Sequence, residues 1–482
     1  MKKLYRTVLM RFRNKFGMTT LIICCICALS CRKFVEIDPP KTSLIKATVF
    51  TDDATATATI IDIYGQMING AAYSSGVVNG LSFKAGLAAD ELDNYSTIVD
   101  RIEYATNNLT PLTSGLNATF WLVPYQTILK ANAVLEGLSA SIGLTPAVKS
   151  RLEGEAKFLR AFAHFYLVNL FGDVPLVLTT DYRINGVIPR TSKTEVYQQI
   201  IKDLKDAQNL LSINYLTATG TVTPERKRVN KFAATAMLAR VYLYTGDWLN
   251  AETEASKVIS YTDLYGSEVI GNMFLKNSKE AIWQLGRDAG NAADAATFLI
   301  PNTAIIPANG ALKASLITLF ASGDLRKLNW IDSLVRPTAK YYYPKKYKVT
   351  AISPISEYAM VLRLGEQYLI RAEARAHQGS KVIGSNSAES DLNFIRNRAG
   401  IGNTSATNEA TMLAAIEQER RFELFTEWGH RWLDLKRTNR ADAVLGPLKG
   451  ITWQTTDQLW PIPQEQILND PAMANQQNPG YN

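Results

Sequence analysis

Apolar residues recur at helical spacing along most of the chain, so the predicted fold is mainly α. The clearest segment follows Thr145-Pro146, an N-cap residue before a first-turn proline. Its apolar stripe, at intervals of three and four residues, consists of Leu152, Ala156, Leu159, Ala163, Tyr166 and Leu170. Further segments of this kind predict helices over Phe120–Leu138, Val196–Leu211, Phe232–Thr245, Trp248–Ile259, Val361–Gln378, Ala388–Arg398 and Thr411–Trp428. Ser192-Lys-Thr-Glu195 reads as a capping box before one of them.

Two of these regions have the pattern of tetratricopeptide-like helical hairpins. In the first, Ala239 and Ala251 are the small residues, Tyr242 and Trp248 are aromatic, and Gly246 stands at the turn. Small residues allow two antiparallel helices to approach closely, and glycine permits the turn. A looser copy runs from residue 371 to 388. The pattern predicts a helical-repeat scaffold.

Two long stretches, residues 69–118 and 262–357, lack helical periodicity. They are rich in Gly, Asn, Ser, Thr and Pro, with scattered aromatic residues and strand-like runs at Ala281–Leu285 and Tyr341–Val349. Irregular stretches of this length are usually functional or disordered, and the aromatic content argues against disorder. We therefore expect loops and a few short strands to carry the ligand side of the molecule.

The N-terminus predicts secretion and a lipid anchor. Residues 1–30 hold six basic and no acidic residues, followed by the apolar run Leu21–Leu29, which is too short to span a membrane as a helix. Ala28-Leu29-Ser30-Cys31 resembles a bacterial lipobox, although the usual leucine three places before the cysteine is alanine. The expectation is a lipoprotein signal peptide at 1–30 and acylation of Cys31; the alternative is an ordinary cleaved signal with a chance cysteine.

Removal of the predicted signal peptide changes both the net charge and the number of cysteines in the remaining chain. The remaining 452 residues carry 46 basic and 44 acidic side chains, so the overall charge of +8 comes mainly from the signal. This balance gives no reason to expect nucleic acid as a partner. The other three cysteines, at positions 24, 25 and 27, leave with the signal, which excludes disulfides and cysteine metal sites.

No pattern of residues predicts catalysis, a metal or a cofactor. His164, His377 and His430 lie in or near predicted helices without a metal-ligand spacing. No phosphate loop and no GxSxG elbow occurs. Asp90-Glu91-x-Asp93 lacks the glycine and the final glutamate of a calcium loop. A pair of glycosidase carboxylates far apart in the chain stays possible in principle, but nothing indicates one.

The densest charged segment is 417–437. Glu417/Arg421, Glu427/Arg431, Arg431/Asp434 and Asp434/Arg437 are three or four residues apart, which on one helix would place each pair together. An acid/base site or a sugar platform is one interpretation. We favour the structural one, a packed helix with mutually paired charges.

Four segments resemble the SusD/RagB family of starch-utilisation-type outer-membrane lipoproteins, in the family's order. They are Glu155–Pro175, Arg363–Ala374, Glu419–Arg437, and Trp460–Pro463 with Gln477–Tyr481. The resemblance implies one SusD-like domain over 31–482, with about four tetratricopeptide-like helix pairs and loop-rich insertions near 69–118 and 262–357. It implies a cell-surface protein that binds oligosaccharide and works with a SusC-like TonB-dependent transporter. Peptide is the ligand in the RagB branch.

The family's ligand residues lie in variable loops, so they are not transferable by motif. From the residues themselves we expect a sugar site to combine ring faces with hydrogen-bonding groups. The candidates are Asn94, Tyr95, Trp283, Arg287 and Tyr341. Trp330 and Trp453 also lie in or beside irregular segments, whereas Trp121, Trp248, Trp428, Trp432 and Trp460 are expected in the core. The alternatives left open are a peptide binder, a non-catalytic repeat scaffold and a secreted hydrolase, the last disfavoured by the missing catalytic groups.

Overall fold

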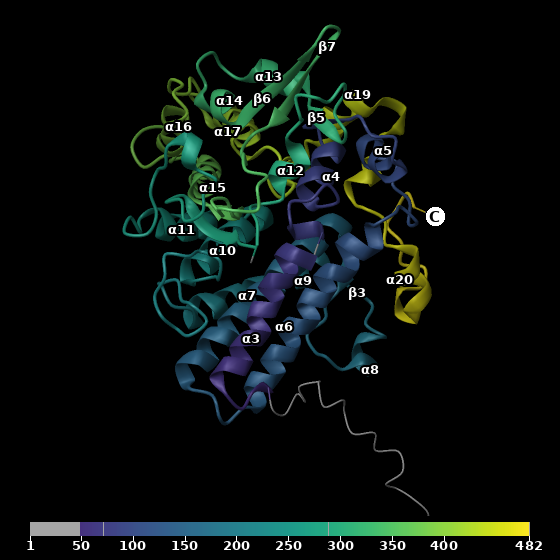
Figure 1. Ribbon diagram of the computed structural model, residues 1–482, viewed down its shortest axis with the longest axis vertical. Helices are drawn as coiled ribbons and strands as arrows, with labels where there is room; N and C mark the ends of the chain where they lie inside the picture. The colour runs from purple at the N-terminus through teal and green to yellow at the C-terminus, as the bar shows by residue number, and fades with distance from the viewer. Residues whose placement is uncertain (1–48, 71, 288, 482) are drawn as a thin grey trace, which may run out of the picture. The chain divides into compact units, whose positions relative to one another are not determined.

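A computed structural model of the chain describes residues 49–70, 72–287 and 289–481. Residues from Phe50 onward form one compact unit, and most of its elements are helices (Figure 1). The predicted signal peptide at 1–30 and Cys31 lie outside the described residues. In the described part of the chain, no helix combines the length and the apolar character needed to cross a membrane.

Four long helices pack side by side in the first half of the unit (Figure 1). They are α3 (Asp53–Gly65), α6 (Val123–Ala140), α7 (Pro146–Phe171) and α9 (Lys193–Leu210). The predicted stripe lies on α7, which begins at Pro146 and is buried along almost all of its second half. Ser192 caps α9 through the Glu195 amide, as the sequence predicts. The Glu195 carboxylate accepts from the Ser192 hydroxyl at 2.6 Å.

The two predicted helical hairpins are present. In the first, α10 (Lys231–Thr245) and α11 (Trp248–Ile259) pack together across Gly246, which adopts the left-handed conformation at φ 73°. Ala239 and Ala251 are fully buried, as close helix packing requires. The second hairpin pairs α15 (Leu364–Ala376) with α16 (Ala388–Arg398). Alanine and leucine side chains from both helices form a buried cluster with residues of α17 (Glu409–Leu424).

The predicted helix 411–428 is shorter at its C-terminal end. α17 stops at Leu424 and α18 (His430–Arg437) starts after a turn in which Thr426, Trp428 and Gly429 have positive φ. Side chains elsewhere in the chain take over the backbone donors of this turn: the Thr426 amide donates to Glu91, and the Trp428 amide donates to Ser82. Tertiary contacts therefore override the helical periodicity of the segment.

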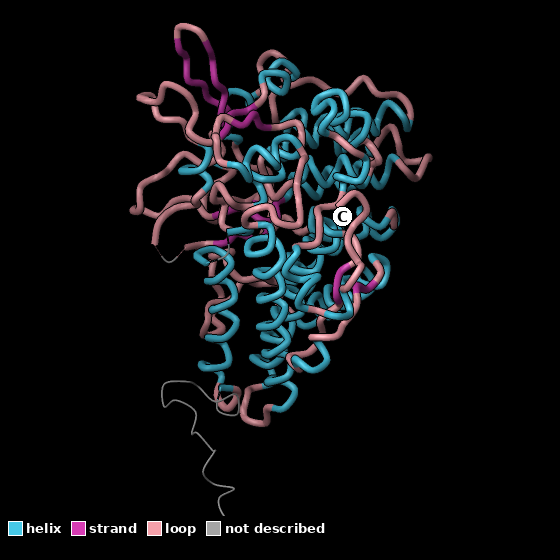
Figure 2. Tube along the Cα trace, turned by 90° about the vertical axis from the view of Figure 1, so that its right-hand side faces the viewer, coloured by secondary structure: helices cyan, strands magenta, loops and turns pink. Residues whose placement is uncertain are grey.

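In the described residues, short strands form three small sheets. A four-stranded sheet has the order β1 (Leu92–Asn94), β5 (Gly310–Leu312), β7 (Ala339–Pro344) and β6 (Ile331–Arg336), with antiparallel neighbours. β4 (Ala281–Leu285) pairs with β8 (Ala359–Arg363), and β2 (Val174–Pro175) pairs with β3 (Arg190–Thr191). The first sheet joins the two irregular stretches, and its β6–β7 hairpin extends away from the helices (Figure 2).

Short helices complete the unit and connect these parts. Their bounds are α4 (Leu81–Ala88), α5 (Val99–Thr106), α8 (Tyr182–Asn185), α12 (Asp294–Phe298), α13 (Ala314–Leu319), α14 (Leu325–Trp330), α19 (Ala441–Lys449) and α20 (Gln464–Asn469). The mainly helical class with few short strands is as the sequence predicts.

Candidate functional site

The four-stranded sheet brings together three of the five predicted ligand residues. Asn94 ends β1, Tyr95 follows it, and Tyr341 lies in β7. The Tyr95 amide donates to the Asn309 carbonyl at 3.1 Å, which continues the pairing of β1 with β5. The rings of Tyr95 and Tyr341 meet edge to face, with their centroids 5.2 Å apart and their planes at 88°. Two distant irregular stretches thus build one aromatic surface, which we call the tyrosine pair.

The tyrosine pair rests on a fixed support. Tyr341 lies opposite Leu334 in the β6–β7 ladder and packs against a buried cluster that includes Ile300 and Tyr343. The loop above this cluster is held by Arg336, whose guanidinium donates to the carbonyl oxygens of Asn302 and Ala304. Tyr95 is 37% exposed and Tyr341 is half-buried. The pair therefore presents ring surface to solvent from a rigid base.

Polar side chains flank the tyrosine pair. Asp93 forms an ion pair with Lys313, and its side chain is 42% exposed. Asn94 bonds to both the amide and the carbonyl of Ser96, so its own amide group is engaged within the turn. Burial, with the charge of Asp93 nearby, raises the pKa of Tyr95. Tyr95 therefore stays a neutral phenol at physiological pH, able to donate and accept a hydrogen bond.

Two groups beside the pair were missed in the sequence. Arg101 donates a hydrogen bond to the Asn309 side chain at 2.7 Å, and Lys313 forms an ion pair with Asp93. Neither belongs to a local motif, because each contact depends on the pairing of β1 with β5. Lys313 is partly exposed, whereas Arg101 is buried. The lysine–carboxylate pair beside exposed rings is suited to hydroxyl recognition.

The structure corrects the prediction for Trp283. This residue lies in β4 and is 0% exposed. The rings of Phe158 and Phe162 each lie 5.1 Å from it, centroid to centroid, and its indole nitrogen donates to the Lys227 carbonyl at 3.3 Å. Both ring faces are covered, so Trp283 offers no surface to a ligand and belongs to the core.

Arg287 lies apart from the contacts of the tyrosine pair, in the loop after β4. It is half-buried, and its positive charge acts on the carboxyl group of Asp294. Burial raises the pKa of Asp294 to about 7, an effect that Arg287 partly opposes. The preceding residues Leu285 and Gly286 line a cavity of about 480 Å³ between α3 and the loop before α10, a hollow that the sequence did not indicate.

The other tryptophans follow the expectations in part. Trp330 is buried like the predicted core residues, and its indole donates to the Ile270 carbonyl. Trp453 is half-buried and donates to Asp442. Trp248 was expected in the core, but it is half-exposed and stacks on His377 at 4.0 Å. Trp121, Trp428, Trp432 and Trp460 are buried as predicted.

The charged segment 417–437 is buried, but most of its pairs differ from the prediction. Only Asp434–Arg437 forms as a local pair among those proposed. Asp434 also binds Arg420, and Arg431 binds Asp90 through two hydrogen bonds of 2.7 and 3.0 Å. Glu427 binds Arg363 and Lys346. Glu427 lies in the turn between α17 and α18, so it does not share a helix with Arg431. Arg421 and Arg431 stay helical but pair with Asp90, which comes from a distant segment of the chain.

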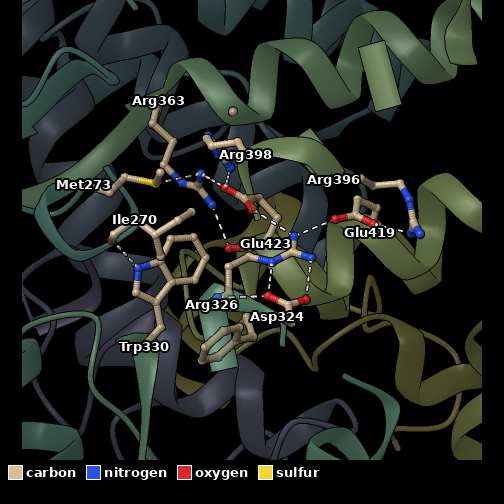
Figure 3. Close-up of polar contacts among 12 residues, drawn as sticks. Ile270, Met273, Asp324, Arg326, Trp330, Arg363, Arg396, Arg398, Glu419 and Glu423 are labelled. Carbon is tan, nitrogen blue, oxygen red and sulfur yellow. Dashed lines mark hydrogen bonds and ion pairs between the residues drawn. The ribbon is translucent and has the colours of Figure 1, made fainter. Parts of the chain in front are cut away.

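A second part of this network fastens the irregular stretch 262–357 to α17 (Figure 3). Arg326 is fully buried and forms ion pairs with Asp324, Glu419 and Glu423. Glu423 also forms ion pairs with Arg363 and Arg398. Burial would raise the pKa of Glu423, but these guanidinium groups outweigh it and hold the pKa far below its usual range. The loops that carry the tyrosine pair are thus tied to the helical scaffold by paired charges.

Two of the three histidines are buried and uncharged. Burial, together with Arg160, lowers the pKa of His164 to about 3. Burial also lowers the pKa of His430 to about 4. Both rings are therefore neutral at physiological pH. Within the ranges that the structure describes, no cluster of three or more His, Cys, Asp and Glu side chains is placed to hold a metal ion.

Comparison with known proteins places this geometry in a family. Residues 53–243 match a model described as "Starch-binding associating with outer membrane", and residues 327–481 match the SusD family model. SusD-like protein P25 of Formosa agariphila is 23% identical over 98% of this chain and 100% of its own length. SusD-like protein P2 of the same organism is 27% identical over 76% of this chain and 81% of its own.

A solved laminarin-binding SusD-like protein has the same fold. It superposes with a TM-score of 0.71 at 22% identity, over 90% of this chain and 100% of that one. The segments that match the family models include the second helical hairpin and the buried charged segment, and together they cover most of the described residues. The chain belongs to the SusD/RagB family of non-catalytic glycan-binding proteins that associate with the outer membrane.

Proposed function

We propose that this protein captures oligosaccharides at the cell surface and delivers them to a SusC-like TonB-dependent transporter in the outer membrane. Membership of a starch-binding family supports the ligand class. The transporter partner rests on the family resemblance. The mechanism is capture without chemistry, in which the partner takes the ligand onward.

The observation that carries the proposal is the tyrosine pair. Sugar rings present rows of C–H groups that stack on aromatic faces, and the edge-to-face geometry leaves ring surface of Tyr95 in solvent. Asp93, Lys313 and Asn309 supply hydrogen-bonding groups beside it. Arg287 stays a predicted ligand residue without a contact to the pair. A solvated site with few desolvated contacts predicts dissociation constants in the range of roughly micromolar to millimolar.

The attachment to the membrane is proposed to be the acylated Cys31. A lipid chain on the first mature residue would hold the protein at the surface, and the segment between Cys31 and α3 would link it to the folded unit. One acyl chain gives only marginal membrane binding, so more than one chain is expected on this residue.

The test is calorimetric titration of the protein with a panel of oligosaccharides and, in parallel, peptides. The Tyr95→Ala and Tyr341→Ala variants are expected to weaken binding of whichever oligosaccharide binds. Tyr182→Ala is the matched control, because Tyr182 is 82% exposed on α8 and far along the chain from the pair. Binding of peptides alone would overturn the glycan assignment. Hydrolysis of a bound sugar by the purified protein would overturn the non-catalytic mechanism.

A further inference from the structure

A second cavity, on the helical scaffold, has a composition unlike the tyrosine pair. It measures about 270 Å³ and lies where α7, α9, α10 and α18 meet. Its charged lining residues are Lys193, Lys436 and Arg437, and no carboxylate lines it. Polar groups of Asn169, Asn439 and Tyr244 complete the wall. A cavity with cationic walls attracts anions, because low-dielectric surroundings strengthen the field of each charge.

The charge of Arg437 is already neutralised. Its guanidinium pairs with Glu373 and with Asp434, and Asp434 also holds Arg420. Two carboxylates therefore balance two guanidinium groups behind the cavity wall. The two lysines are the remaining basic residues of the cavity lining.

Neither lysine has a carboxylate partner in an ion pair among the residues that the structure describes. The Lys436 ammonium donates to the Asn169 carbonyl and lies 5.5 Å from the Trp432 ring centroid. Removal from water, with the repulsion of Lys193 nearby, lowers the pKa of Lys436 well below its usual range. Asp173 is the carboxylate that acts on Lys193, and it accepts a hydrogen bond from the Lys193 backbone amide.

A third donor points to the same ligand chemistry. The Tyr244 hydroxyl is buried and has no hydrogen-bond partner among the described residues. A buried hydroxyl without a partner costs stability unless a bound water or ligand satisfies it. Tyr244 lines the cavity together with the two lysines, and no carboxylate is among the lining residues.

We propose that this cavity binds a tetrahedral oxyanion group, such as a sulfate or a phosphate, between Lys193, Lys436 and Tyr244. The volume lies below the range typical of sites for drug-sized ligands, so it fits a charged group and its immediate attachment rather than an oligosaccharide. The site is independent of the tyrosine pair, and its failure would leave the glycan proposal untouched.

The experiment titrates the full-length protein with sodium sulfate, sodium phosphate, glucose 6-sulfate and glucose 6-phosphate at constant ionic strength, by calorimetry and by thermal shift. Saturable binding is expected for at least one of them. Tighter binding of the free anions would identify an inorganic ion as the ligand, and tighter binding of the sugar esters would identify the charged group of a larger ligand.

The variants Lys436→Gln and Lys193→Gln are each expected to weaken this binding by roughly tenfold or more, the loss of one charge-assisted hydrogen bond. Lys202→Gln is the matched control on the same helix, because Lys202 is exposed and paired with Asp206. If Lys436→Gln fails to fold, the exposed Lys193 decides the question. Absence of saturable binding, or equal affinity in the Lys193 variant and the control, would overturn the proposal.

Discussion

Tyr95 and Tyr341 meet edge to face at 5.2 Å, although they come from two different irregular stretches of the chain. The contact exists because β1 and β7 both pair with β5 in one antiparallel sheet. Each ring orients the other, so the surface is formed before a ligand arrives. Pre-formed sites lose less conformational entropy on binding, which matters most where the contacts are few.

Replacing either tyrosine by alanine is predicted to weaken oligosaccharide binding by about 1–2 kcal/mol, the range for a stacked aromatic contact. The double variant should lose less than the sum of the two single losses, because each ring also positions the other. Calorimetric titration of the three variants measures this coupling. Strict additivity would mean that the two rings act separately.

Arg431→Ala is predicted to lower the free energy of unfolding by about 3 kcal/mol, the low end for breaking a buried pair. The low end applies because Arg421 still contacts Asp90 at 2.7 Å. Denaturant unfolding measures the loss, and Arg183→Ala, which removes an exposed pair with Asp181, should change little. Intact stability with abolished oligosaccharide binding would instead assign Arg431 to a ligand site.

The sequence was most informative where structure depends on near neighbours. The stripe on α7 and the hairpin turn at Gly246 follow from local spacing and from one residue's backbone freedom, and both are present. The break after Leu424 was not predictable, because donors of that turn bind Glu91 and Ser82 from a distant segment. Long-range contacts decide such cases, and periodicity does not report them.

The same distinction between local signals and long-range contacts applies to the candidate site. Aromatic and polar residues in irregular stretches made Tyr95 and Tyr341 separate candidates, and the sequence did not predict their contact, which depends on strand pairing. The same reasoning failed for Trp283, because β4 packs against aromatic side chains of α7, and this buries a residue that lies next to a loop in the sequence. Whether these side chains bind ligand stays a prediction.

Cys31→Ala is predicted to release the protein from the outer membrane when the transporter partner is absent, because acylation of this residue is the proposed attachment. Cell fractionation followed by immunoblotting measures the distribution, and metabolic labelling with a radioactive fatty acid checks the modification directly. Ser30→Ala is the control, since a small residue before the cysteine is retained. Unchanged membrane retention of Cys31→Ala in a strain lacking the partner would contradict the anchor.

The buried carboxyl group of Asp294 predicts how the stability of the protein changes with pH. Its Oδ2 atom is buried without a hydrogen-bond partner among the described residues, and Gly76 packs so closely that a β-carbon there would overlap the carboxyl group. Burial, with Glu427 and Glu357 nearby, raises the pKa to about 7 from an ordinary 3.8. The folded state therefore holds a proton between about pH 4 and 7 that the unfolded state has released.

Since Asp294 holds its proton in the folded state in this window, its contribution to the free energy of unfolding falls as pH rises from about 4 to 7. Asp294→Asn removes this titration. The free energy of unfolding of the variant, relative to that of the wild type, should therefore rise by on the order of 2 kcal/mol between pH 4 and pH 8. This lies within the limit of ~1.4 kcal/mol for each unit of pKa shift. Denaturant unfolding at both values measures the difference. Taking the difference between variant and wild type cancels the other titrating groups, including Glu91, whose pKa burial also raises to about 7. A stability difference that is the same at pH 4 and pH 8 would show that the Asp294 carboxyl group is already ionised throughout the window, held by Arg287.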